Sequence, residues 1–274
     1  MKNIAFGQYY PADSPLHKMD ARMKVILSVL YIVCTFLCKN VLAFGALLLS
    51  ALFLTLLSRI PFRMIIRALR PLIFIMLFTA VLNLFFARGE TVLWSFWRLK
   101  ITLEGIYSAV FMLVRIITLV LATSLFLTYT TTPIALTDAL ERLFSPLRVL
   151  HVPVHEFAMM TSIALRFIPT LSEETYKIMN AQKARGVDFS NGGLIRRAKA
   201  LVPILIPLLV SAFRRAEELA LAMECRCYRG GQGRTRMTIP HLHARDFVWL
   251  FCFVLFGTGL VLLNRLGYGY TVVS

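Results

Sequence analysis

The chain has 274 residues, of which 58% are hydrophobic and 16% are charged, and its mean hydropathy is +0.72. A soluble domain is usually less than half apolar, so this composition excludes an ordinary soluble protein and predicts an all-α integral membrane protein. The net charge of +16 does not indicate nucleic-acid binding, because the basic residues cluster in a few segments between apolar blocks.

Five apolar blocks are candidates for membrane spans, since a span needs about 20 mostly apolar residues. They cover about residues 25–38, 41–57, 72–87, 106–129 and 247–263. Only Lys39-Asn40 separates the first two, which predicts a tight helical hairpin. The alternative of a sixth span at Leu201–Phe213 is less favoured, because the run is short and holds Pro203 and Pro207. We expect a kinked helix at the membrane face there.

Lys and Arg residues predict the orientation, because cytoplasmic loops carry an excess of them. Sixteen of the 30 lie between Arg142 and Arg245. We therefore expect a multi-pass protein of the cell membrane with a cytoplasmic N-terminus and an external C-terminus. The predicted regions are residues 1–128 with four spans, a cytosolic helical region at 129–246, and the last span with the C-terminus at 247–274.

The cytosolic region shows three helical patterns. The first covers about 133–147, with Thr132 as the expected N-cap and Pro133 at the first helical position. The second follows Pro153 and ends near Ala184, and the third covers about 194–226. Glycine-bearing loops end the second and third patterns, which predicts two long helices with defined C-terminal ends.

Two short motifs centred on arginine close these long helices. They are Ala184-Arg185-Gly186 and Cys225-Arg226-Cys227. Arg at a helix C-terminus is also favoured by the helix dipole, so one such residue alone is weak evidence of function. An arginine at the C-terminal end of two consecutive helices favours a pair of partner-binding sites, since arginine makes several hydrogen bonds to a partner at once.

With these motifs in place, the chain resembles the transmembrane T component of energy-coupling factor (ECF) transporters for vitamins and metals. The run Tyr10–Lys24 resembles the family's opening signature, and Ala184-Arg185-Gly186 matches its first arginine motif. Glu224-Cys225-Arg226-Cys227-Tyr228 stands where the second is expected. The family usually has Ala-Arg-Gly there, so the two cysteines are a departure, as is Ala21 where proline is common.

The resemblance implies a transmembrane energy-coupling subunit without catalysis of its own. Two cytosolic ATP-binding-cassette ATPases would bind the two helix ends, with Arg185 and Arg226 each entering a groove on one ATPase. The expected ATPase-contacting residues are Ala184, Arg185, Gly186, Cys225, Arg226 and Cys227. A small membrane protein, the S component, would hold the vitamin or transition metal. The remaining partner is the lipid bilayer, and we expect no cofactor.

Two other functions stay open at this point. One is an integral membrane enzyme that uses the acidic residues of the cytosolic helices. The other is the permease of a conventional ABC importer, because Asn180-Ala181-Gln182 followed by Gly186 loosely resembles the coupling loop of those permeases. The chain has no G-x-x-x-x-G-K-[ST] loop, so ATP hydrolysis must come from a partner.

Polar residues inside the apolar blocks are further candidates. Arg115 lies in the middle of the fourth block, where a charge costs roughly 2.5–3.5 kcal/mol on insertion scales. It holds the fold or contacts the S component, and Asn83 of the third block is a candidate hydrogen-bond partner. Cys225-x-Cys227 with His241-x-His243 has the residue types of a zinc site, but the spacing is atypical, so we expect no metal.

Overall fold

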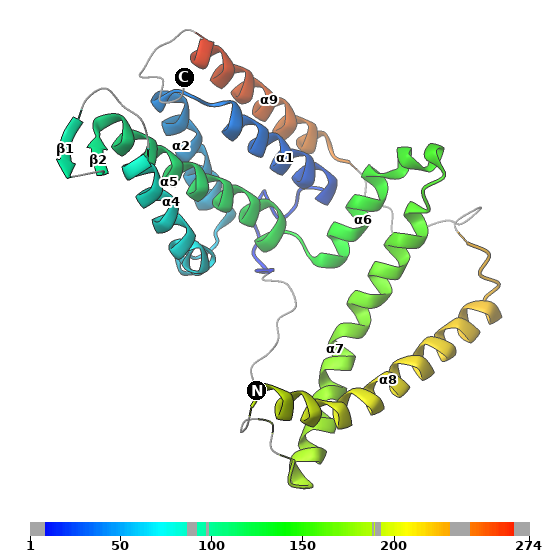
Figure 1. Ribbon diagram of the computed structural model, residues 1–274. Helices are drawn as coiled ribbons and strands as arrows, with labels where there is room; N and C mark the ends of the chain where they lie inside the picture. The colour runs from blue at the N-terminus through cyan, green and yellow to red at the C-terminus, as the bar shows by residue number, and fades with distance from the viewer. Residues whose placement is uncertain are drawn as a thin grey trace. The chain divides into compact units, whose positions relative to one another are not determined.

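The structure is a computed structural model, and it describes residues 9–86, 92–96, 99–187, 189, 193–230 and 242–265. The chain divides into two compact units (Figure 1). The first combines Met1–Ala139 with Ile239–Ser274, and the second is Leu140–Thr238. The first unit is therefore built from both ends of the chain. The three regions expected from the sequence stay a prediction.

The first unit is a bundle of apolar helices. It contains α1 (Ala21–Leu37), α2 (Val41–Ser58), α3 (Phe62–Leu69), a 3₁₀ turn η1 (Arg70–Leu72), α4 (Ile73–Phe86), α5 (Leu103–Thr123), a π-helical segment η2 (Ser124–Tyr129) and α9 (Ala244–Arg265). Helix α6 (Pro133–Leu143) begins in this unit and ends in the second.

Four helical segments are long and apolar enough to cross a membrane: Val41–Ser58, Phe62–Phe85, Leu103–Tyr129 and Ala244–Arg265. Helix α1, with 17 residues, covers the first predicted block and lies at the lower end of the length needed for a span. The prediction of a helical membrane protein is therefore confirmed, with four candidate spans among the described residues, and a fifth span at α1 stays a prediction. The third span begins earlier than predicted, because α3 and η1 continue directly into α4.

A short antiparallel hairpin interrupts the helices, and the sequence analysis did not predict it. It consists of β1 (Val92–Phe96) and β2 (Leu99–Thr102), which lie between α4 and α5. Phe96 pairs with Leu99 and Val92 with Thr102. Thr102 ends the hairpin and begins α5, since its Oγ1 accepts a hydrogen bond from the Gly105 N–H at 3.1 Å.

Three residues separate α1 from α2, and polar contacts link these helices to each other and to α9. Tyr31 is fully buried, and its hydroxyl donates to the Leu47 carbonyl at 2.6 Å. At the outer turn, the Asn40 side chain donates to the Leu263 carbonyl of α9 at 3.3 Å. The last span is thus tied to the first two by hydrogen bonds as well as by apolar packing.

The segment before α1, which carries the opening signature, folds against the end of η2. The Tyr10 N–H donates to the Tyr129 carbonyl at 3.0 Å. The His17 ring contacts the Ser14 hydroxyl at 2.7 Å through Nδ1 and the Tyr10 carbonyl at 2.8 Å through Nε2. Burial lowers the pKa of His17, which favours the neutral ring. A carbonyl only accepts, so Nε2 carries the proton and Nδ1 accepts from Ser14.

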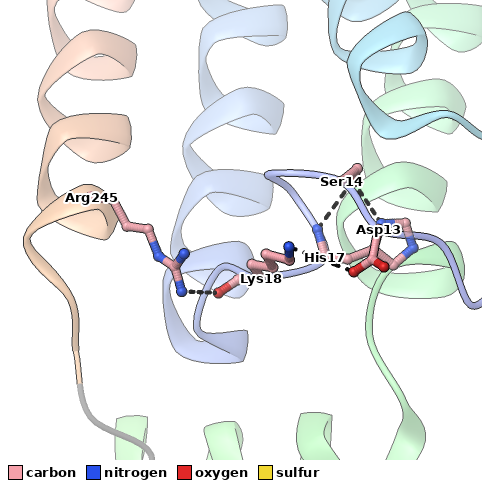
Figure 2. A network of polar contacts seen from close by, with 5 residues as sticks. All are labelled: Asp13, Ser14, His17, Lys18 and Arg245. Atoms are coloured by element: carbon pink, nitrogen blue, oxygen red, sulfur yellow. Dashed lines mark hydrogen bonds and ion pairs between the residues drawn. The ribbon is translucent and has the colours of Figure 1, made fainter.

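The same segment reaches the start of α9 (Figure 2). Arg245 donates to the Lys18 carbonyl at 3.2 Å, and the Lys18 ammonium lies 3.6 Å from the Asp13 carboxylate. Lys24, at the start of α1, is 2% exposed and donates to the carbonyls of Thr130 at 2.7 Å and His17 at 3.3 Å. The signature therefore joins α1, η2 and α9 at one end of the bundle.

Replacement of Lys24 tests this joint. Lys24→Met keeps the length of the side chain but leaves the buried carbonyl of Thr130 and the partly buried carbonyl of His17 without this donor. We expect a loss of about 2–4 kcal/mol in the free energy of unfolding, measured by thermal unfolding in detergent. Lys39→Met, at an exposed position, is the matched control and should change little. Equal stability of both variants would contradict this role of Lys24.

Candidate functional site

Two long helices dominate the second unit. Helix α7 spans Val154–Ala184 and α8 spans Leu194–Cys225, while a short 3₁₀ segment η3 (Ser145–Leu150) precedes α7. These bounds agree with the second and third predicted helices. Both helices continue through internal prolines, at Pro169 in α7 and at Pro203 and Pro207 in α8. Among the described residues, α8 is not one of the helices apolar enough to span, which agrees with the preferred prediction.

A polar clasp joins α7 to α8, and we use this name for Glu174, Ser211 and Arg215. The Ser211 hydroxyl donates to one oxygen of the Glu174 carboxylate, and the Arg215 guanidinium donates to the other at 3.0 Å. The hydrogen bond from Ser211, with the nearby charge of Arg215, lowers the pKa of Glu174 below its ordinary value. The carboxylate therefore stays ionised at neutral pH and links α7 to α8, two helices that cross in Figure 1.

An apolar pocket of ≈ 280 Å³ lies beside the clasp, between the two helices. Its apolar lining comprises Ile163, Phe167, Leu171, Ala212, Ala216, Leu219, Ala220 and Met223. Nearer the start of α8, the apolar side chains from Leu201 to Phe213 are largely exposed; Phe213, for instance, is 68% exposed. An exposed apolar surface of this extent indicates contact with a membrane or a protein.

Helix α7 ends in a Schellman motif. Gly186 has a φ of +87°, and its N–H donates to the Lys183 carbonyl at 2.9 Å. The Val187 N–H reaches back to the Gln182 carbonyl at 3.1 Å. These bonds satisfy carbonyls that a helix end otherwise leaves free, and the left-handed residue turns the chain away directly after Arg185.

Helix α8 ends with the same pattern around Arg226. The Cys227 N–H donates to the Glu224 carbonyl at 2.8 Å, and the Tyr228 N–H donates to the Met223 carbonyl at 3.0 Å. Here the left-handed residue is Cys227, with a φ of +55°. The turn that glycine makes in the first motif is therefore made in the second by a residue with a Cβ. The departure from Ala-Arg-Gly does not prevent the tight turn, although it adds backbone strain.

Both arginines occupy the capping position of their helix, and both side chains are exposed. Within the described ranges, no hydrogen bond or ion pair holds either guanidinium. Ala184, Gly186, Cys225 and Cys227 are exposed as well. Each of the two helix ends thus presents a guanidinium group with a permanent charge and five N–H donors. Such a group suits a partner that offers carboxylates or carbonyls.

The other candidate residues have different surroundings. Among the residues that the structure covers, no group of three or more Cys, His, Asp or Glu could hold a metal. Cys225 and Cys227 are free thiols, and His241 lies outside the described residues. His155 bonds Glu141 at 2.9 Å, so this histidine ties α6 to α7.

Arg115 lies half-buried in α5 beside two aromatic rings that contact each other. Its guanidinium carbon is 5.3 Å from the centre of the Phe44 ring and 5.9 Å from that of Phe111. Cation–π attraction to the two ring faces therefore offsets part of the cost of a charge inside a span. The Asn83 amide nitrogen donates to the Thr79 carbonyl of its own helix at 2.9 Å, and a pairing of Asn83 with Arg115 stays a prediction. A short polar side chain in a helix often donates in this way to the carbonyl one turn back.

Comparisons with known proteins agree on one family. Residues 12–238 match the family model described as "CbiQ: Cobalt transport protein". The chain is similar to the energy-coupling factor transporter transmembrane protein EcfT of Ruminiclostridium cellulolyticum, with 48% identity over 96% of this chain and 98% of the relative. It is also similar to the proteins of that name from Clostridium kluyveri, at 47% over 98% and 99%, and from Brevibacillus brevis, at 50% over 91% and 92%.

Because Cys227 is strained and Gly186 is not, we predict that substitutions at these two positions change the stability of the helix ends in opposite directions. Cys227→Gly should stabilise the end of α8 by about 0.5–1 kcal/mol, because glycine adopts positive φ without the Cβ clash. Gly186→Ala should weaken the end of α7 by a similar amount; its Cβ would meet no atom within 4 Å, so the cost is one of backbone conformation. Amide hydrogen exchange in the last turn of each helix measures both effects.

Cys225→Ala is the control, since it removes a thiol at a helical position and should leave exchange unchanged. Faster exchange at the end of α8 in Cys227→Gly would contradict the assignment of strain to Cys227.

Proposed function

Because this chain belongs to the family of energy-coupling factor transmembrane T components, to which EcfT and CbiQ belong, we propose that it couples two cytosolic ATP-binding-cassette ATPases to a membrane-embedded S component. In this proposal the chain performs no catalysis. The ATPases hydrolyse ATP, and the S component holds the substrate, a vitamin or a transition-metal ion. The names of the relatives support the transport role, and the geometry of the second unit supports the coupling role.

The observation that carries the proposal is the equivalence of the two helix ends. Arg185 and Arg226 follow the same pattern of main-chain hydrogen bonds and are equally free of partners in the described residues. Two equivalent projections fit two similar ATPase subunits, one for each arginine. Each guanidinium would enter a groove of its ATPase and donate there to carboxylates or carbonyls, which the fixed backbone turn pre-orients at little entropic cost.

The clasp supports the transmission of motion. The clasp connects α7 and α8 several turns before the C-terminal end, or tip, of each helix. A displacement of one tip is therefore transmitted to the other helix through this contact. Closure of the ATPases on ATP would move the two tips relative to each other about the clasp. The apolar pocket beside it and the exposed side chains of Leu201–Phe213 offer the S component an apolar surface that changes shape in this motion.

The proposed orientation places the N-terminus and the second unit in the cytoplasm. The distribution of Lys and Arg supports it, because the segments on that side carry most of the 30 basic residues. The acidic residues of this unit are less suited to an enzyme, since Glu174 serves the clasp and Glu141 bonds His155.

Charge reversal of the two arginines tests the proposal. Arg185→Glu together with Arg226→Glu should abolish co-purification of the ATPases, because each substitution places a carboxylate where a guanidinium is needed. Each single variant should retain one ATPase subunit. The measurement is the stoichiometry of the purified complex by mass spectrometry.

Arg166→Glu with Arg214→Glu is the matched control, since it makes the same change of charge at exposed positions on the same two helices. This control should keep both ATPases. A stoichiometric complex formed by the Arg185/Arg226 double variant would refute the proposed docking.

A further inference from the structure

Four arginines gather where α2 ends and α3 begins. They are Arg59, Arg63, Arg67 and Arg70, which we call the basic patch, and all four are exposed. Arg63, Arg67 and Arg70 are spaced by four and three residues, so they share one face of the helix. In the described part of the molecule, no ion pair engages any of the four. Between Asp20 and Glu104 the sequence has a single acidic residue, Glu90.

Helix α3 has three distinct faces. Ile65 is buried at 6% exposure, and Met64 and Ala68 pack against the core of the first unit. The Tyr129 hydroxyl donates to the Met64 carbonyl at 2.8 Å and fixes this face to the bundle. Phe62 and Ile66 lie between the core face and the basic face, and they are 52% and 62% exposed. An exposed apolar stripe beside an arginine stripe is the pattern of a helix at a membrane interface.

The length of the span places the patch in the headgroup layer. The segment Phe62–Phe85 has 24 residues and is the least covered of the candidate spans, with 6% of its apolar window buried. At about 1.5 Å per residue it is roughly 36 Å long, whereas the hydrocarbon core of a bilayer is about 30 Å thick. The excess of about one turn lies outside the hydrocarbon and holds Arg63. Arg67 and Arg70 follow within the next two turns, and their long side chains extend back toward the headgroups while their methylene groups stay in apolar surroundings.

From these observations we propose that the basic patch binds the phosphate group of an anionic phospholipid. The planar guanidinium forks suit a phosphodiester, and two or more of them on one helix face can share one headgroup. Phe62 and Ile66 would contact the first methylenes of the acyl chains. The lipid accounts for both stripes at once, because its phosphate matches the arginines and its acyl chains match the two apolar side chains. The inference is independent of the ATPases and of the S component.

Native mass spectrometry of the full chain in detergent tests the site, with phosphatidylglycerol and phosphatidylcholine as probes. The wild type should retain phosphatidylglycerol in preference to phosphatidylcholine. The triple variant Arg63→Gln, Arg67→Gln, Arg70→Gln should bind phosphatidylglycerol at least about tenfold more weakly, since each basic residue near a membrane surface contributes to anionic-lipid attraction. Arg166→Gln, Lys177→Gln, Lys199→Gln removes the same charge from exposed positions of the second unit and should bind like the wild type.

Two further measurements distinguish a lipid phosphate from a free phosphate, and a loss of contacts from misfolding of the variant. Inorganic phosphate and glycerol phosphate should not displace the lipid at equal concentration, and displacement by either would overturn the lipid assignment. The variant Arg63→Lys, Arg67→Lys, Arg70→Lys keeps the charge and should still bind more weakly, because an ammonium lacks the bidentate geometry. Wild-type retention of phosphatidylglycerol by the lysine and the glutamine variants would refute the site. Loss of ATPase co-purification in the glutamine variant with unchanged lipid retention would instead assign the patch to a protein partner.

Discussion

The contact on which the second unit depends is the clasp of Glu174 with Ser211 and Arg215. Helices α7 and α8 meet there through one carboxylate that accepts from a hydroxyl and a guanidinium. Because the clasp is partly exposed, its net contribution to stability is small, and its importance is geometric. It sets the crossing point of two long helices, and thus the positions of Arg185 and Arg226 within one unit.

The exposed apolar side chains of the two units call for different surroundings. In the first unit it belongs to helices that are long enough to span, and lipid covers such surface in a membrane protein. In the second unit it lies on α8, where the internal prolines and the flanking arginines disfavour a span. Hydrophobic side chains that remain exposed on such a helix need a partner, which is consistent with a subunit that works only in a complex.

The sequence predicted the long helices and their ends well, because proline, glycine and helical periodicity mark them locally. It did not predict the β1–β2 hairpin, since a short strand pattern between two spans is overshadowed by the stronger apolar blocks. Nor could it predict that Cys227 adopts a left-handed conformation, because cysteine has no preference for it and only the helix end imposes it. The joint between the opening signature, η2 and α9 depends on contacts across more than 100 residues, such as Lys24 with Thr130. Such contacts leave no local pattern.

The central claim is that the tips of α7 and α8 move relative to each other when the ATPases bind ATP. Spin labels at Ala181→Cys and Ala222→Cys, in a chain whose native cysteines are replaced, measure the distance between the tips by pulsed electron paramagnetic resonance. In the complex with hydrolysis-deficient ATPases, the account predicts that ATP shifts this distance, and that ATP leaves it unchanged in the chain alone. An identical distance distribution in the complex with and without ATP would contradict the account.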